Sequence, residues 1–461
     1  MIRNVAGAPS LAEHVSATRT AIMVPSKPAV LQSLFVALYA GLWYLGWVIV
    51  PGIGRPEKLV VVIGMLAVPV AIGCRSKVPP TMVWMGLVGL LGTYVLSYYA
   101  NDPSPEGLDL VISLTARVLF LWICFVNLQN AIILQRAVWL LICSSLVSAG
   151  VALAVMAKYG VGIGRLDPVG LEATLDPFTF STFASAQLAT MGGLLLLGTA
   201  WTLTSRGKRL AATAGSLVIF GTAYLCYFRR EHLISIPVLL LTFALGGDRS
   251  LRRRALAATF VAIVGFAAVA VWDYSREESV LQTRIESEFG GGVVDPVETR
   301  LTNFQAELKA IADRPLRGFG AGTHTAAIAP YAQPGERFLS SFNLLAWLAV
   351  EGGLPCAFSY LVLLMGVGRV VWRYRLLPGS GPHALILRCG PVLVLQIVLW
   401  GIFGNAWDLP LGWFVLGLIL AAARLAGDAP PAGAGDRSRF GRGIAYAKQP
   451  PRLMRQLPHS R

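Results

Sequence analysis

The sequence predicts an all-α polytopic membrane protein with about twelve transmembrane helices and one large outer loop that itself contains helices. Of the 461 residues, 55% are hydrophobic and only 14% are charged. The mean hydropathy is +0.63, and this much apolar surface cannot be buried in one water-soluble core. The apolar residues are gathered in segments long enough to cross a bilayer. The only long polar insertion lies late in the chain, at 273–352.

Polar stretches separate the apolar segments and set their number and orientation. The predicted spans are 31–50, 58–74, 80–99, 108–127, 131–157, 180–204, 209–228, 231–247, 255–272, 353–373, 385–404 and 410–426. Lysine and arginine concentrate near both termini, and basic segments beside spans mark the cytoplasmic side. We therefore expect a multi-pass protein of a bacterial inner (cytoplasmic) membrane with both termini cytoplasmic.

This orientation divides the chain into five parts. They are a cytoplasmic N-terminal segment at 1–29, spans one to nine within 30–272, a periplasmic loop at 273–352, the last three spans within 353–426, and a basic, disordered cytoplasmic tail at 427–461. The net charge of +15 follows the segments beside spans, so membrane lipids and not nucleic acid are the expected partners. The six cysteines form no CxxC pair, and neither a metal nor another cofactor is predicted.

The large loop begins with a predicted amphipathic helix at 298–311. Its apolar residues recur at three- and four-residue spacing, as Leu301, Phe304, Leu308 and Ile311. Arg300 falls on the same stripe as Phe304 and Glu307, where a buried guanidinium needs a counter-charge. Two partners remain open for it, namely Glu307 at i+7 and an anionic ligand.

Three further arginines stand at unusual places in this topology. Arg229 and Arg230 fall in a tight outer-face turn, where they either snorkel to the lipid headgroups or bind phosphate oxygens through bidentate hydrogen bonds. Arg117 lies near the middle of the fourth span, at a cost of about 3 kcal/mol. It is therefore expected to face the protein interior or a wet cavity.

A glycine-rich turn follows the predicted loop helix. Gly318, Gly320 and Gly322 alternate in it, and they either allow backbone to approach a ligand closely or make an ordinary loop. His324, the only histidine of the large loop, is either solvated or a general base. Clustered arginines without an aspartate-rich metal motif favour an anion held by guanidinium groups, such as a diphosphate leaving group.

These stretches resemble the O-antigen ligase and polymerase superfamily. The resemblance rests on Arg300, on PLRGFGAG at 315–322, and on NLL and EGG between Asn343 and Gly353. It implies a metal-independent inverting glycosyltransferase that transfers or polymerises a glycan from a polyprenyl-diphosphate-linked oligosaccharide donor to a glycan or lipid acceptor. Surface or exopolysaccharide biosynthesis is the implied process.

The resemblance also implies roles for individual residues. Arg229, Arg230 and Arg300 would hold the donor diphosphate, while Asn343, Gly318, Gly320 and Arg317 would position the acceptor or the loop. The family usually has a histidine before the asparagine, but here this residue is Phe342. Either His324, Glu351 or Glu298 then supplies the base, or base assistance is weak, or this chain is not an active ligase.

Two other functions compete with a glycosyltransferase. A lipid or glycan transporter or flippase would show inverted repeats and charges at the membrane midplane, and Arg117 and Pro237 within predicted spans keep that hypothesis open. A non-catalytic scaffold of envelope assembly would tolerate lysine in place of the outer-face arginines, whereas bidentate diphosphate recognition would not.

Overall fold

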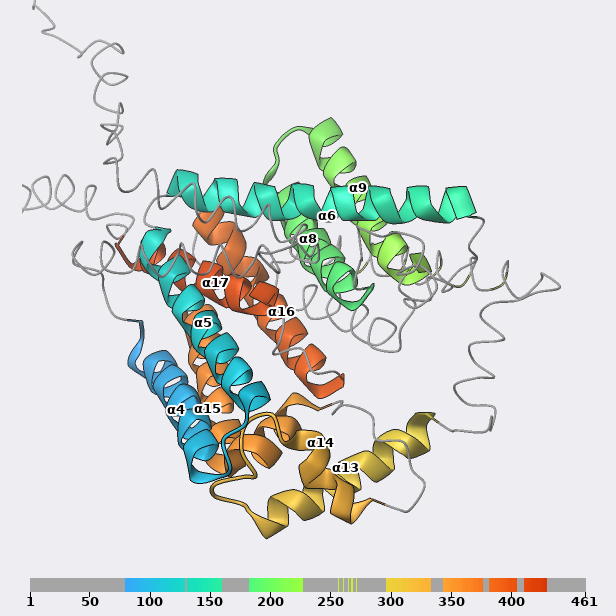
Figure 1. The fold of residues 1–461 in the computed structure, drawn as a ribbon. Helices are drawn as coiled ribbons and strands as arrows, with labels where there is room; N and C mark the ends of the chain where they lie inside the picture. Colours follow the sequence, from blue (N-terminus) through green and yellow to red (C-terminus); the bar gives the residue numbers. More distant parts are fainter. Residues whose placement is uncertain are drawn as a thin grey trace, which may run out of the picture.

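The computed structural model describes residues 79–128, 131–159, 182–226, 296–332, 343–375, 381–403 and 410–428, together with isolated positions between 256 and 271. Every regular element in these ranges is helical, which confirms the predicted fold class for them. The helices in chain order are α4 Thr81–Ala100, α5 Pro105–Asn127, α6 Ala131–Tyr159, α8 Thr182–Thr202, α9 Arg206–Cys226, α13 Pro296–Asp313, α14 His324–Ile328, the 3-10 helix η2 Ala329–Tyr331, α15 Leu344–Tyr374, α16 Pro382–Phe403 and α17 Pro410–Asp428 (Figure 1).

Eight of the predicted spans coincide with helices of this part of the chain, namely α4, α5, α6, α8, α9, α15, α16 and α17. Five helical segments are long and apolar enough to cross a membrane: Thr81–Ala100, Pro105–Val126, Ala131–Gly150, Leu344–Tyr374 and Pro382–Ile402. The predicted spans at 31–50, 58–74 and 231–247 lie outside the described residues, as does 255–272 apart from isolated positions. The total of about twelve spans and the orientation of the termini therefore stay predictions.

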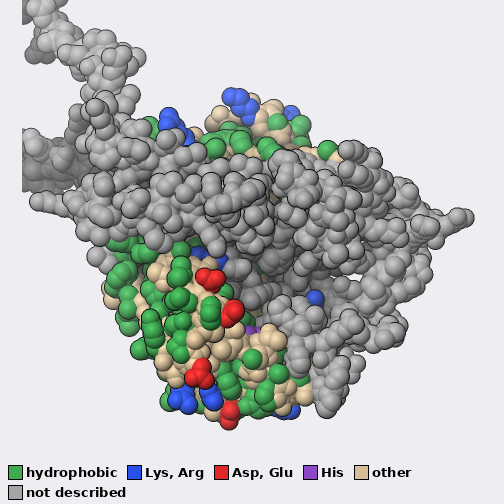
Figure 2. All heavy atoms as spheres, viewed as in Figure 1, with side chains coloured by type: hydrophobic (Ala, Val, Ile, Leu, Met, Phe, Trp, Pro, Cys, Tyr) green, Lys and Arg blue, Asp and Glu red, His purple; other side chains and the backbone are tan. Residues whose placement is uncertain are grey.

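Hydrophobic side chains cover the outer surface of α4 and α5 (Figure 2). Met85 and Leu96 on α4 are 63% and 69% exposed, and Ile112 on α5 is 54% exposed. In a water-soluble protein such large exposed apolar surfaces are unusual. On a membrane-spanning helix they are the surface that faces lipid.

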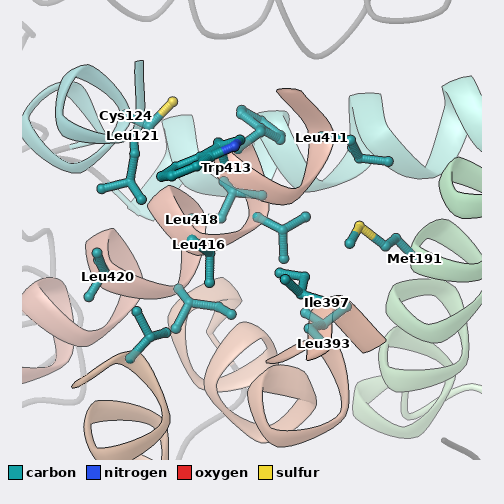
Figure 3. Packing of buried hydrophobic residues seen from close by; sticks show 14 of the residues in the cluster. Leu121, Cys124, Met191, Leu393, Ile397, Leu411, Trp413, Leu416, Leu418 and Leu420 are labelled. Carbon is teal, nitrogen blue, oxygen red and sulfur yellow. The ribbon is translucent and has the colours of Figure 1, made fainter. Parts of the chain in front are cut away.

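The buried core joins helices that are distant in the sequence. Figure 3 shows Leu121 and Cys124 of α5, Ile397 of α16 and Trp413 of α17 packed together, with Met191 of α8 nearby. A Cβ atom on Gly417 would lie 2.6 Å from the Cβ of Cys124, so the missing side chain lets α17 lie directly on α5. Close approach at small residues is how helices associate in lipid, where hydrophobic burial contributes little.

Helices α4 and α15 form an antiparallel pair. Near the start of α4, a Cβ on Gly86 would lie 2.5 Å from the backbone nitrogen of Leu363. Near its end, the Tyr94 ring lies 6.1 Å from that of Trp347, centroid to centroid. The pair therefore brings the end of α4 to the beginning of α15, where the loop after α13 also arrives (Figure 1).

Helix α15 is broken at Gly353, whose φ of 77° and ψ of 170° are not helical. The break puts Pro355 in the first turn of the following helical segment, where a missing N–H costs nothing. It also releases backbone carbonyls at the end of the preceding segment. The predicted span at 353–373 corresponds to the part of α15 that begins at this break.

The predicted inward stripe of α13 holds at Glu307, which is buried, and at Ile311, which is partly buried, but it is wrong for the other three large apolar residues. Leu301, Phe304 and Leu308 of its apolar stripe are 55%, 36% and 49% exposed. The buried side chains are instead Asn303, Ala306, Glu307 and Ala310. Small alanines pack against Ile328 and Val350, because they allow the helix backbone to come close to α14 and α15. Close backbone approach therefore decides which face turns inward, and the bulky residues face outward.

Candidate active site

The loop between α13 and α14 docks onto the break in α15. The Phe319 N–H donates to the Val350 carbonyl at 2.9 Å, and the Gly320 N–H donates to the Glu351 carbonyl at 3.0 Å. In the other direction, the Leu354 N–H donates to the Pro315 carbonyl at 2.7 Å. The backbone groups that the break removes from the helix are thus satisfied by the loop.

Two glycines make this docking possible. Gly318 has a φ of +62°, and a Cβ on it would lie 2.4 Å from the carbonyl oxygen of Glu351. Gly353, with a φ of +77°, would bring a Cβ to 2.4 Å from the carbonyl oxygen of Leu316. A left-handed backbone and an approach this close both require glycine. Gly320 is also left-handed, with a φ of +107°.

The end of α4 fixes the same loop from the other side. The Ser97 hydroxyl oxygen lies 2.5 Å from the backbone carbonyl oxygens of both Arg317 and Glu351. Because a hydroxyl has a single proton, it donates to one of these two oxygens at a time. Arg314 Nη1 donates to Asn101 Oδ1 at 3.1 Å, and the Arg314 guanidinium lies 4.6 Å from the centroid of the Phe319 ring. The loop is thereby held against two helices at once.

His324 is buried and paired with a carboxylate. It is the first residue of α14 and is 5% exposed. Its Nε2 lies 2.9 Å from Oε1 of Glu307, which is 2% exposed. An ionised Glu307 favours the tautomer with the proton on Nε2, which leaves the Nδ1 lone pair as the basic site. The expectation that Glu307 faces inward is confirmed, and its carboxylate contacts His324.

Glu351 connects this pair to α4. Its side chain is 1% exposed. Oε1 accepts from the His324 backbone N–H at 3.2 Å, and Oε2 accepts from the Tyr94 hydroxyl at 2.5 Å. Arg117 of α5 is 8% exposed, which confirms that it faces the interior, and it interacts electrostatically with Tyr94.

The inward face of α13 carries two more polar residues before Glu307. Arg300 is half-buried and lies seven residues, about 10 Å, before Glu307 on this face. Asn303 lies between them and is 3% exposed. Neither the amide oxygen nor the amide nitrogen of the Asn303 side chain has a hydrogen-bond partner in the described part of the chain. A buried amide without partners costs free energy and is the kind of group that a bound ligand or water satisfies.

The structure places the predicted site residues that it describes at different positions around the break in α15. His324 and Glu351 meet at the break in α15, with Gly318 and Gly320 in the docked loop and Arg300 farther along α13. The Arg317 side chain is exposed, and only its carbonyl takes part in the docking. Asn343 is the N-cap of α15, where its Oδ1 accepts from the Leu345 and Ala346 N–H groups at 2.9 and 3.2 Å. Arg229, Arg230, Phe342 and the Glu298 side chain lie outside the described residues.

Sequence reasoning missed the contribution of α4. Tyr94, Ser97 and Asn101 all contact the loop or Glu351. Their spacing of three, four and seven residues puts them on one helix face, so a polar face at the end of an apolar span was a usable signal. What the sequence could not supply was the partner, because Glu351 lies 257 residues beyond Tyr94.

Comparisons with known proteins do not assign this site. No family model matches the chain, and no curated protein matches it. Within the described residues, no group of three or more His, Cys, Asp or Glu side chains is placed to hold a metal ion. The chemistry of the site therefore has to be argued from its own residues.

Proposed function

We propose that the protein is a membrane glycosyltransferase that transfers or polymerises a glycan from a polyprenyl-diphosphate-linked donor. The observation that carries this proposal is the buried His324–Glu307 pair on the α13 face that also carries Arg300. A carboxylate-oriented imidazole is a general base, and a guanidinium about 10 Å along the helix suits a phosphate-bearing leaving group.

In the proposed reaction the acceptor sugar presents a hydroxyl to Nδ1 of His324. As its proton passes to Nδ1, the hydroxyl oxygen forms a bond to the anomeric carbon of the donor. The bond from that carbon to the diphosphate breaks, and the electron pair leaves with the polyprenyl diphosphate. One in-line displacement inverts the anomeric configuration. Glu307 holds the tautomer and stabilises the imidazolium that forms.

Arg300 holds the leaving diphosphate in this proposal. A guanidinium offers planar, bidentate donors to phosphate oxygens. The Asn303 amide, which has no hydrogen-bond partner among the described residues, lies between Arg300 and Glu307 on the same face of α13 and would supply a further donor. Arg229 and Arg230 remain candidates for the second phosphate, on the strength of the resemblance alone.

Glu351 is a positioning residue in this proposal and not the base. Both of its carboxylate oxygens are occupied, one by the His324 backbone N–H and the other by the Tyr94 hydroxyl. It fixes the first residue of α14 and so the direction of the imidazole. Of the bases that the sequence left open, His324 is the one whose ring nitrogen is paired with a buried carboxylate in the described part of the chain, which supports its proposed role.

The test of the chemistry follows the fate of the donor. Lipid-linked oligosaccharides from the producing cells are incubated with the purified protein, and the release of polyprenyl diphosphate is measured. We expect His324→Gln to lower the rate about 10²–10⁴-fold, which is the usual contribution of a general base. Glu307→Gln should lower it by a smaller factor. Unchanged rates in both variants would exclude the proposed base.

The test of the donor site uses binding and has a matched control. Polyprenyl diphosphate at about a hundred times its dissociation constant should stabilise the protein by about 2.7 kcal/mol in detergent. Arg300→Ala should abolish this stabilisation, whereas Lys309→Ala, an exposed cation on the same helix, should retain it. Movement of labelled lipid across a liposome bilayer without cleavage of a bond would instead favour a transporter or flippase.

A further inference from the structure

A second site is open at the opposite end of the α4–α15 pair. A cavity of about 520 Å³ lies where the start of α4 meets the ends of α5, α15 and α17. This volume falls within the about 300–1,000 Å³ typical of small-molecule sites. Its apolar wall includes Met82, Phe125, Val370 and Leu420. Nothing in the proposed transfer reaction uses this end of the molecule.

Among the described residues that line the cavity there are three arginines and no acidic side chain. Arg369 and Arg373 lie one turn apart on α15, and both are exposed. Like charges at this spacing repel one another in an isolated helix, and neither arginine has a carboxylate partner in the described part of the chain. An anion between them would relieve this repulsion.

The third arginine is held in place by the protein. Arg424 of α17 donates from Nη2 to the Leu128 carbonyl at 3.1 Å and from Nη1 to the Val126 carbonyl at 3.4 Å. Its guanidinium also lies 5.1 Å from the centroid of the Phe125 ring. It closes the C-terminal end of α5, and so it adds a fixed positive charge to the cavity wall.

We propose that this cavity binds the phosphate headgroup of an anionic phospholipid. The arginines would contact the phosphate, and the apolar wall would contact the first part of the acyl chains. Basic pockets between membrane helices bind anionic headgroups in this way. Trp372 lies next to Arg373 on α15 and is 68% exposed, and the Arg375 guanidinium carbon lies 3.2 Å from the centroid of its ring. Exposed tryptophans of this kind are common at membrane interfaces.

The experiment measures lipid binding to the full chain in detergent. Thermal unfolding is recorded with dioleoyl phosphatidylglycerol, with dioleoyl phosphatidylcholine and with glycerol 3-phosphate, at equal ionic strength. Native mass spectrometry counts the lipids retained in each case. Of the two lipids, we expect only phosphatidylglycerol to give a stabilising shift. One bound phosphatidylglycerol molecule should be retained after all other lipids have been removed. An equal shift with phosphatidylcholine would overturn the proposal, because it would show no requirement for an anion.

Two double variants separate the cavity from general surface charge. Arg369→Ala/Arg373→Ala should weaken phosphatidylglycerol binding about 25-fold, from about fivefold for each basic residue. Arg206→Ala/Lys208→Ala removes two exposed charges at the start of α9, outside the cavity, and should leave binding unchanged. Equal losses in both double variants would overturn the proposal. Arg424 is left intact because it closes the end of α5.

The measurement with glycerol 3-phosphate shows whether the cavity binds a lipid headgroup or a free phosphate ester. The lipid proposal expects it to stabilise the protein far less than phosphatidylglycerol, because it lacks the chains that would contact the apolar wall. An equal shift with both, lost in Arg369→Ala/Arg373→Ala, would assign the cavity to a free phosphate ester and overturn the lipid.

Discussion

The two ends of the α4–α15 pair differ in where their ionisable side chains lie and in what satisfies them. At the loop end, Glu351 is 1% exposed and both of its oxygens accept hydrogen bonds from the protein. At the other end, Arg369 and Arg373 are exposed beside a cavity that no acidic side chain of the described residues lines. A buried charge must be compensated inside the fold, whereas an exposed cluster of one sign is compensated from outside. The loop end should therefore govern stability, and the cavity end should respond to added anions.

The largest expected effect comes from preventing the loop from docking. Gly318→Ala places a Cβ 2.4 Å from the Glu351 carbonyl oxygen and imposes a left-handed backbone on alanine. Strain and lost hydrogen bonds together should lower the free energy of unfolding by about 3 kcal/mol or more. Thermal unfolding in detergent measures the loss.

Gly368 supplies the control for this substitution. It lies in the regular part of α15, and a Cβ on it would meet nothing within 4 Å. Gly368→Ala should therefore stabilise the helix slightly, by about 0.5–1 kcal/mol. If both variants unfolded at the same temperature, the docking of the loop would contribute nothing to stability and the contrast between the two ends would be lost.

A smaller effect is expected when the buried carboxylate loses one donor. Tyr94→Phe removes the hydroxyl that donates to Glu351 Oε2 at 2.5 Å and should lower the free energy of unfolding by about 1.5–3 kcal/mol. Tyr99→Phe, at an exposed position on the same helix, should change it by less than about 0.5 kcal/mol.

A double-mutant cycle sharpens this result. With Glu351→Gln as the second substitution, the Tyr94→Phe loss should shrink, because the carboxyl oxygen that accepts from the hydroxyl is replaced by an amide. Additive losses would show that Tyr94 acts through packing alone. The phosphatidylglycerol shift at the far cavity should be the same in all four proteins of the cycle.

The elements that composition and periodicity control were predictable. Helices α4, α5, α6 and α17 begin and end within about three residues of the predicted spans, because long apolar segments end where polar residues and prolines begin. Helix α15 begins nine residues before the predicted span at 353. Hydropathy does not distinguish the two helical segments on either side of Gly353, because both are apolar, and it gives no sign of the backbone break between them.

The sequence proposed residues for the candidate site but could not supply the contacts between them. The sequence singled out Arg300, His324 and Glu351, and the structure brings His324 and Glu351 into contact. Glu307 was considered only as a partner for Arg300, and it contacts His324. The exposed stripe of α13 was mistaken because Leu301 and Phe304 have the periodicity of a buried face. The buried face is the one with Ala306 and Ala310, because these small side chains let α13 pack closely on α14 and α15. The periodicity of apolar residues along the sequence does not show which neighbouring helix comes this close.

The smallest expected effect concerns the beginning of α15. Asn343→Ala removes the side-chain oxygen that accepts from the Leu345 and Ala346 N–H groups, and it should lower the free energy of unfolding by about 1 kcal/mol. Asn343→Asp keeps this acceptor and adds a negative charge at a helix N-terminus, so it should restore most of the loss. Thermal unfolding of both variants without phosphatidylglycerol measures the stability lost at the N-cap, and the same experiment with the lipid measures whether the lipid-induced shift is retained. Because Asn343 lies at the loop end of α15, its loss should leave the lipid shift intact. A lipid shift that fell with the cap would mean that the two ends unfold as one coupled unit.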